Sequence, residues 1–335
     1  MTRAHTIVVG IYSPFVAWNI PATHVERLRA TFPHDRFLHA QSEREALELI
    51  PDADVAFMSE VRPEHLAAAR HLEWIHSPAA GVGSMLFPAM IESPVRMSNS
   101  RGISADTIAE HVLAVTLVLF RKLTLAFQSQ TTHTWAQDAV LADPPLRTIA
   151  GSDVLIVGLG SIGMATARRM SALGARVTGV RRHADGSPPA FVDRVGPPQV
   201  LLDLLPSADV VVVAAPQTRE TRHLIGAREL GALRRDSVLV NVSRGALVDE
   251  RALATALSAA PATRTIGAAA LDVFEHEPLA QESPLWGLPN VLITPHMAGF
   301  RADHWDAVTA LFADNLRRFE SGQPLLNVVR KEEGY

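Results

Sequence analysis

A glycine-rich turn between an apolar run and a helical stretch constrains this chain more than any other feature. Residues 153–157 have the composition of a buried strand, and the pattern G-x-G-x-x-G follows at once at 158–163. A helix is predicted over 164–173 and a second strand over 175–180. The glycines therefore lie at the first strand-to-helix turn of a βαβ unit, which is where a dinucleotide-binding fold of the Rossmann type places them.

Each glycine of this pattern has a distinct physical task. Gly158 permits the tight turn, Gly160 allows the backbone to approach a pyrophosphate, and Gly163 allows helix and strand to pack closely. The N–H groups at the start of the helix attract anionic oxygens. The alternative is an ordinary strand-to-helix turn with incidental glycines, but the flanking strand, helix and second strand favour a dinucleotide site.

Composition and charge narrow the class of protein. A chain of 335 residues with 47% hydrophobic and 20% charged residues can form two globular domains. It has no cysteine, which excludes disulfides and thiolate metal sites, and we expect no metal. A net charge of −4 supplies no broad basic surface for nucleic acid. The most apolar run, 112–120, is too short to span a bilayer, and no apolar leader follows the first residues, so we expect a cytoplasmic protein without a membrane partner.

The first hundred residues alternate short apolar runs with amphipathic stretches, a pattern that indicates a parallel sheet covered on both faces. The expected strands are 6–11, 36–40, 54–59 and 72–76, and the expected helices are 25–31, 43–50 and 63–69. A loop containing Ala80 and Gly81 follows the last of these strands, where open α/β sheets place ligands. Its glycines either expose backbone N–H groups to a small anion or serve a loop that needs positive φ.

The rest of the chain continues the alternation. A long helix is predicted at 106–123, and we expect it to be buried on most sides. A polar connection at 131–145 then joins it to the glycine-rich unit, and we expect Trp135 in this connection to be a packing residue. Further strands at 208–215, 237–242, 265–273 and 291–294 bring the predicted sheet to six strands. The last helix, 302–320, and the tail return to the first domain. We therefore expect an α/β protein of two parallel-sheet domains, with a dinucleotide-binding domain at 101–299 inserted into a discontinuous domain at 1–100 and 300–335.

Three polar side chains follow the later strands of the predicted sheet. Arg244, Glu277 and His296 would lie near a bound nicotinamide, because the carboxyl ends of parallel strands meet at one edge. Taken singly, each has an ordinary structural explanation. Together they suit the reduction of a ketone by hydride, which needs a proton donor, a carboxylate that orients it, and a cation that holds a substrate carboxylate.

At these residues the chain resembles the D-isomer-specific 2-hydroxyacid dehydrogenases, a family that includes phosphoglycerate dehydrogenase, glyoxylate/hydroxypyruvate reductase, D-lactate dehydrogenase and formate dehydrogenase. The resemblance runs from about residue 72 to residue 327. Its motifs occur in family order at 106–113, 158–163, 241–250, 270–279 and 290–296.

The resemblance implies a role for each matching residue and a homodimer as the assembly. It implies Arg244 as the substrate-binding arginine, Glu277 as the carboxylate partner, His296 as the acid/base, and backbone N–H groups near Ala80 and Gly81 as binders of the substrate carboxylate. It also implies cofactor contacts from Ser161, Ile162, Ala215, Pro216, Val242, Asp272 and Gly299.

The chain departs from the common family pattern after the second strand of the glycine-rich unit. An acid usually binds the ribose 2′-hydroxyl there, whereas this chain has Arg181 and Arg182. Guanidinium groups suit a 2′-phosphate, so we expect NADP(H) to be preferred, with NAD(H) possible.

The resulting prediction is an oxidoreductase that reduces a small 2-oxo acid, similar to glyoxylate or hydroxypyruvate, to the D-2-hydroxy acid. Two alternatives remain open. One is a formate dehydrogenase, against which Glu277 counts, because that branch of the family pairs its histidine with glutamine. The other is a dinucleotide-sensing protein similar to the C-terminal-binding corepressors, which keep the same three residues.

Overall fold

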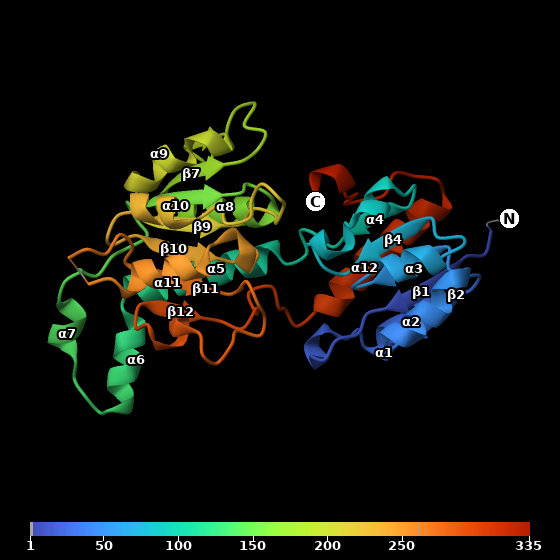
Figure 1. Cartoon of the computed structure of the whole chain (residues 1–335), viewed down its shortest axis with the longest axis horizontal. Helices are drawn as coiled ribbons and strands as arrows, with labels where there is room; N and C mark the ends of the chain where they lie inside the picture. The colour runs from blue at the N-terminus through green and yellow to red at the C-terminus, as the bar shows by residue number, and fades with distance from the viewer. Residues whose placement is uncertain (1–2, 261) are drawn as a thin grey trace. The chain divides into compact units, whose positions relative to one another are not determined.

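The computed structural model describes residues 3–260 and 262–335, and the chain divides into two compact units. One unit comprises the chain up to Ile103 together with Arg301–Tyr335, and the other is Ser104–Phe300. The expected boundaries, near residues 100 and 299, lie within a few residues of these. Figure 1 shows the elements of each unit.

The discontinuous unit contains a five-stranded parallel sheet in the order β2-β1-β3-β4-β5. Its strands are β1 (Thr6–Gly10), β2 (Arg36–Ala40), β3 (Val55–Met58), β4 (Trp74–Ser77) and β5 (Arg96–Asn99). Its helices are α1 (Ala22–Thr31), α2 (Glu43–Leu49), α3 (Pro63–Ala68), α4 (Pro88–Glu92) and α12 (His304–Glu320). The strand order reverses between β1 and β3, which is the flavodoxin-like arrangement.

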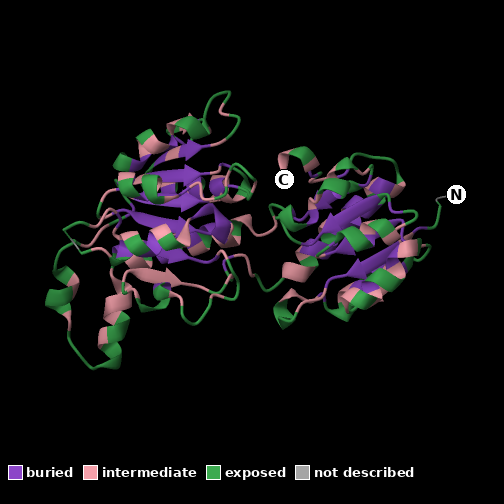
Figure 2. Ribbon diagram, in the orientation of Figure 1, coloured by how far each residue is buried: buried purple, intermediate pink, exposed green. Residues whose placement is uncertain are grey.

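The side chains of β1 point alternately to the two faces of the sheet, and both faces are covered. Ile7 and Val9 pack with Phe312 of α12 in one apolar cluster, whereas Val8 packs with Ala46 of α2 in the other. Successive side chains of a strand point to opposite faces, so a strand that is apolar at every position must be buried on both. Figure 2 shows this burial along the strands and the exposed outer surfaces of the helices.

The inserted unit contains a seven-stranded parallel sheet in the order β12-β11-β10-β9-β6-β7-β8. Its strands are β6 (Asp153–Val157), β7 (Arg176–Val180), β8 (Arg194–Gly196), β9 (Val210–Val213), β10 (Val238–Asn241), β11 (Ala268–Leu271) and β12 (Val291–Ile293). Its helices are α5 (Ala105–Phe120), α6 (Leu123–Thr131), α7 (Gln137–Leu141), α8 (Ser161–Ala172), α9 (Leu201–Leu204), α10 (Ala227–Ala232) and α11 (Glu250–Ser258). This is the doubly wound order of a dinucleotide-binding fold with one strand added at an edge.

Two features of this unit were not expected. The sheet has seven strands and not six, because β8 adds an edge strand after β7. Helix α6 begins where the predicted long helix ends, and α7 lies within the polar connection. Helix α5 is buried or partly buried on most sides, as expected, and its exposed residues, Leu117 among them at 39%, form one stripe.

Within the described residues, no single helix is long and apolar enough to cross a membrane. Helices α5 and α6 meet the requirements of length and composition only as a pair, and they are bent by 68°.

Candidate active site

The glycine-rich turn joins β6 to α8 and has the geometry that a dinucleotide requires. Gly158 has φ +103°, and a Cβ there would lie 2.5 Å from the backbone nitrogen of Ala215. A Cβ on Gly163 would overlap the carbonyl oxygen of Gly158, so the helix could not approach the strand. Gly160 is the helix N-cap, and among the described residues other than its chain neighbours no atom lies within 4 Å of its Cβ position. The turn thus offers open backbone next to the first N–H groups of α8, those of Ser161 and its neighbours, and it fits a pyrophosphate.

The two arginines lie beside this turn. Val180, the last residue of β7, pairs with Val157 of β6, and its carbonyl accepts a hydrogen bond from Gly158 N–H at 2.8 Å. Arg181 follows directly, and its guanidinium donates to the carbonyl of Asp185 at 3.2 Å. The Arg182 guanidinium donates to Glu220 at 2.7 Å. Both cations therefore stand at the carboxyl edge next to the glycines, with part of their hydrogen-bonding capacity already engaged.

The other predicted cofactor residues follow neighbouring strands at the same edge. Ala215 and Pro216 come after β9, Val242 directly follows β10, and Gly299 lies in the loop after β12. Val242 N–H donates to the carbonyl of Val213 at 3.3 Å, which continues the pairing of β9 with β10.

His296 and Glu277 form a hydrogen-bonded pair. His296 Nδ1 lies 2.6 Å from Glu277 Oε2, and the other carboxylate oxygen accepts the N–H of Phe274 at 3.0 Å. Burial by itself would raise the pKa of Glu277, but these hydrogen bonds outweigh it and hold the pKa below its usual value. Glu277 is therefore a carboxylate at neutral pH, and protonation would remove its charge only as the pH falls through this lowered pKa. The pairing orients the imidazole so that Nε2 is the nitrogen presented for chemistry.

Arg244 supplies the cation of the site. Arg244 follows β10, Glu277 follows β11 and His296 follows β12. These three strands are adjacent in the sheet (Figure 1). Burial lowers the pKa of Arg244, and the nearby Glu277 carboxylate opposes this shift. Because a guanidinium remains charged in proteins, its partly desolvated charge favours the binding of an anion.

Asp272 holds the loop that carries His296. Its buried carboxylate accepts hydrogen bonds from the hydroxyl of Thr294 at 2.6 Å and from the N–H groups of Met297 and Ala298 at 2.9 and 3.0 Å. His296 itself has φ +51°, a left-handed conformation that costs a non-glycine residue free energy. The three hydrogen bonds offset that cost and fix the direction of the imidazole. Asp272, which the resemblance implied as a cofactor contact, thus has a structural task in this unit.

Sequence reasoning missed the groups that support these residues. The Thr294 hydroxyl also lies 3.3 Å from Nε2 of His111 on α5. Asn241 donates to the carbonyl of Arg244 at 3.1 Å and accepts the N–H of Ser243, which shapes the turn that presents the arginine. Asn241 and His111 both fall within the motifs noted above, but a motif by itself does not show which backbone groups a side chain contacts.

Ala80 and Gly81 belong to the discontinuous unit and follow β4. Both are exposed, and neither N–H donates a hydrogen bond to any residue that the structure describes. Asn99 donates to the carbonyl of Ala80 at 2.6 Å and so anchors the loop. The two N–H groups are therefore available to an anion, as the glycines in this loop suggested.

The same edge of this unit contains a cavity of about 380 Å³, formed where the strand order reverses between β1 and β3. Tyr12, Ser59, Glu60 and Trp305 line it, and Ala79 forms part of its wall next to the loop just described. Open α/β sheets bind small ligands at this position.

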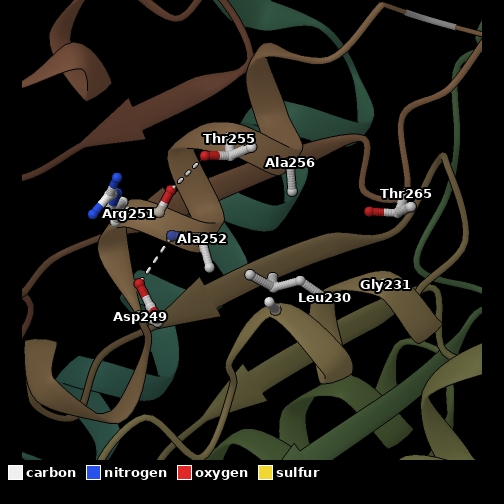
Figure 3. Close-up of a pocket in the computed structure, with 9 residues that line it drawn as sticks. Leu230, Gly231, Asp249, Arg251, Ala252, Thr255, Ala256 and Thr265 are labelled. Carbon is white, nitrogen blue, oxygen red and sulfur yellow. Dashed lines mark hydrogen bonds between the residues drawn. The ribbon is translucent and has the colours of Figure 1, made fainter.

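A second cavity, of about 470 Å³, lies between α10 and α11 of the inserted unit (Figure 3). Small side chains line it, among them those of Ala252 and Ala256. The Asp249 carboxylate accepts the N–H of Ala252 at 2.9 Å as the cap of α11, so its charge serves the helix. None of the predicted site residues lines this cavity.

Comparison with known proteins agrees with this geometry. The model of the D-isomer specific 2-hydroxyacid dehydrogenase NAD binding domain matches residues 113–298. The chain is 31% identical over 309 residues to a glycerate dehydrogenase of Methylorubrum extorquens, an alignment that covers 89% of this chain and 93% of that one.

Two solved structures share the fold along the whole chain. A D-isomer specific 2-hydroxyacid dehydrogenase family protein from Aeromonas salmonicida has a TM-score of 0.82 at 34% identity, covering 98% of this chain and 100% of that one. An NADPH-dependent glyoxylate/hydroxypyruvate reductase from Sinorhizobium meliloti, in complex with NADP and sulfate, has a TM-score of 0.82 at 26% identity, covering 99% and 100%.

The family model spans more than half of the chain and ends just beyond the histidine that pairs with Glu277. This protein therefore belongs to the D-isomer-specific 2-hydroxyacid dehydrogenases, enzymes that use a pyridine nucleotide to interconvert small 2-oxo acids and D-2-hydroxy acids.

Proposed function

We propose that this enzyme reduces a small 2-oxo acid such as glyoxylate or hydroxypyruvate, and that it prefers NADPH. The observation that carries the proposal is the hydrogen-bonded His296–Glu277 pair, which lies near Arg244 at the carboxyl edge of a nucleotide-binding sheet. The Sinorhizobium meliloti relative, described as an NADPH-dependent reductase of these two oxo acids, supports the same substrates.

Each residue has a defined task in the proposed reaction. When bound, the reduced nicotinamide supplies a hydride to C2 of the oxo acid. His296 donates its Nε2 proton to the carbonyl oxygen, so that no alkoxide accumulates. Glu277 accepts a hydrogen bond from Nδ1 and stabilises the imidazolium before transfer. Arg244 binds the substrate carboxylate and carbonyl through its planar pair of donors.

The same proposal assigns the N–H groups of Ala80 and Gly81 to the substrate carboxylate. Backbone donors bind an anion without adding a positive charge. The cavity of about 380 Å³ next to this loop is large enough to accept the side chain of the oxo acid, including groups larger than the hydroxymethyl group of hydroxypyruvate.

The two alternatives are tested by turnover. A formate dehydrogenase has no proton to transfer to a carbonyl, whereas Glu277 and His296 are paired as a proton-transfer system requires. A purely dinucleotide-sensing protein would bind the cofactor and turn over no oxo acid.

A panel of carbonyl compounds should show that the carboxylate is required. With NADPH, hydroxypyruvate and glyoxylate are expected to be reduced, and glycolaldehyde, which is hydroxypyruvate without its carboxylate, to react at least about 100-fold less efficiently. The reason is the loss of two charge-assisted hydrogen bonds to Arg244. Steady-state kcat/KM for each compound is the measurement. Equal efficiency for hydroxypyruvate and glycolaldehyde would contradict the substrate assignment, and no turnover with any oxo acid would favour the sensing protein.

Replacing Arg244 by lysine tests whether the site needs only a positive charge or also the planar shape of the guanidinium. Arg244→Lys keeps the positive charge but loses the planar fork, and we expect kcat/KM for glyoxylate to fall by about 10- to 100-fold. Arg251→Lys, at an exposed arginine on α11, serves as the matched control and should leave kcat/KM unchanged. If Arg244→Lys retained wild-type kcat/KM, the two-pronged contact would have to be abandoned.

We also propose that the enzyme is a homodimer. Helices α6 and α7 project away from the seven-stranded sheet of their unit (Figure 1), and Phe127, Trp135 and Leu141 on this arm are exposed. Trp135 is 90% exposed, so the packing role expected for it is not fulfilled within the chain. Exposed apolar side chains of this size commonly mark a protein interface.

Light scattering after size-exclusion chromatography tests the dimer. The wild-type protein is expected at twice the chain mass, and the double substitution Phe127→Asp with Trp135→Asp at the mass of one chain, because two buried charges would oppose association. Leu173→Asp, at an exposed apolar position of the same unit outside the arm, should leave the dimer intact. A monomeric wild-type protein would contradict the proposal.

A further inference from the structure

Three potential metal ligands gather in the discontinuous unit, at the edge of its sheet opposite to Ala80 and Gly81. His5 precedes β1, Asp35 precedes β2, and Glu320 is the last residue of α12. One ligand atom from each lies within 4.8 Å of the other two. Nothing in the proposed reaction uses these side chains.

Strand pairing brings His5 and Asp35 together. The parallel register pairs Thr6 with Arg36, so the residues just before them are also neighbours. Arg36 N–H donates to the carbonyl of His5 at 2.9 Å, and His5 N–H donates to Asp35 Oδ1 at 2.9 Å. The backbone thus holds the carboxylate next to the imidazole.

Helix packing brings the third side chain. Phe312, Leu316 and Phe319 of α12 are buried in the apolar cluster on this face of the sheet. The ring of Phe319 meets the His5 imidazole edge to face, with ring centroids 5.2 Å apart. Glu320, the next residue, therefore reaches the same place.

The His5 imidazole has an unsatisfied nitrogen directed at this cluster. The residue is only 8% exposed. Its Nδ1 is buried and makes no hydrogen bond to any residue within the described ranges, and it lies 3.7 Å from Asp35 Oδ1, beyond hydrogen-bonding distance. A buried polar atom without a partner costs free energy, and a cation bound between Nδ1 and the carboxylates would remove that cost.

Two carboxylates stand beside this nitrogen. The ligand oxygens of Asp35 and Glu320 lie within 4.8 Å of each other and of the imidazole. A divalent ion at this place would be bound by both acids and by His5.

We propose that His5 Nδ1, Asp35 and Glu320 bind one divalent transition-metal ion, and that Zn²⁺ is the ion they suit best. Zinc takes imidazole nitrogen and carboxylate oxygen at about 2.0 to 2.2 Å, in sites with three protein ligands and a water as well as in closed ones. Ligand atoms of a tetrahedral zinc site lie roughly 3.3 Å apart, so modest side-chain movement closes the observed cluster. Mg²⁺ and Ca²⁺ prefer six or more oxygen ligands and fit this set poorly.

The site would join parts of the chain that are far apart in sequence. In the sequence, Asp35 precedes the inserted unit and Glu320 follows it. The C-terminal helix α12 is part of the apolar cluster on one face of the sheet, so the discontinuous unit needs this helix to stay packed there. Binding to the folded unit alone stabilises it in proportion to the logarithm of the free metal concentration. The inferred role is therefore structural and separate from the reaction.

Zinc titration of the full-length protein tests the site. After exhaustive dialysis against a chelator, isothermal titration with ZnCl₂ should show one more equivalent bound to the wild-type protein than to Glu320→Gln or His5→Asn. Zinc at 100 times its dissociation constant should raise the melting temperature of the discontinuous unit by roughly 5 to 10 °C, and this rise should be absent in both variants. Counting the difference in equivalents separates this site from zinc bound elsewhere, for example at His296.

The matched control is Glu48→Gln, at an exposed position on α2 of the same unit, which should bind zinc as the wild type does. Circular dichroism checks that each variant is folded, and Asp35→Asn replaces any variant that is not. Equal stoichiometry in wild type and ligand variants would overturn the proposal. A second outcome would also overturn it. If zinc left the wild-type melting temperature unchanged, and if that temperature shifted with pH in the wild type but not in Glu320→Gln, Asp35 and Glu320 would share only a proton.

Discussion

Replacement of His296 by alanine is expected to lower turnover of a 2-oxo acid by roughly 10²- to 10⁴-fold, the range usual for loss of a general acid. The imidazole is the proton donor in the proposed reaction. Glu277 lies 2.6 Å from Nδ1, which is not the nitrogen that donates the proton. Single-turnover measurements at saturating NADPH would isolate the chemical step. Cofactor affinity should be nearly unchanged, because the nucleotide is bound at the glycine-rich turn and not by the imidazole.

Glu277→Gln tests the same proton transfer and is expected to have a smaller effect. The amide keeps the size and part of the hydrogen bonding but loses the charge that stabilises imidazolium, so turnover should fall less than in His296→Ala. Arg251→Lys again serves as a control outside the site. Near-wild-type turnover in His296→Ala would refute the acid assignment, whatever Glu277→Gln does.

Cofactor choice is the second large effect. Arg181 and Arg182 stand at the end of β7 beside the glycine-rich turn, where NAD-specific relatives need an acid. Charge-assisted hydrogen bonds contribute about 1.5 to 3 kcal/mol each, so one or two of them to a 2′-phosphate correspond to roughly tenfold to several-thousandfold preference for NADPH. Solvent and salt reduce the preference for NADPH because the arginines lie at an exposed edge. The Arg182–Glu220 ion pair reduces it as well.

The ratio of kcat/KM for NADPH to that for NADH, at fixed ionic strength, measures the preference. It should fall towards one in the double variant Arg181→Ala with Arg182→Ala and should fall in wild type as salt is raised. Arg194→Ala, at an exposed arginine on β8, should leave the ratio unchanged. A wild-type ratio near one, or a ratio that the double variant does not alter, would mean that these arginines point into water and do not bind the phosphate.

Elements with a local signal were predicted well from the sequence. Strand β2 was expected at residues 36–40 and is found at Arg36–Ala40, because Phe37 and Leu38 stand between polar stretches that indicate turns. Gly158 and Gly163 of the turn after β6 have the packing tasks expected of them, because close backbone contact leaves no room for a side chain. Strand β8 was missed because its three residues carry no periodicity. Helices α6 and α7 were missed because each is short and has neither a side-chain cap nor a buried face.

The sequence by itself determined that this chain has a dinucleotide-binding unit, because the glycine-rich turn and its flanking strands form a local motif. It also placed Arg244, Glu277 and His296 in short motifs, and the tertiary structure shows that His296 and Glu277 form a hydrogen bond. The tertiary structure alone decided how the buried carboxylate of Asp272 fixes the loop of His296, and that His5, Asp35 and Glu320 meet. Those contacts join residues up to several hundred positions apart, and strand register and helix packing bring them together. Neither leaves a signal at the individual residue, since a single histidine or acid looks the same whether it faces water or another strand.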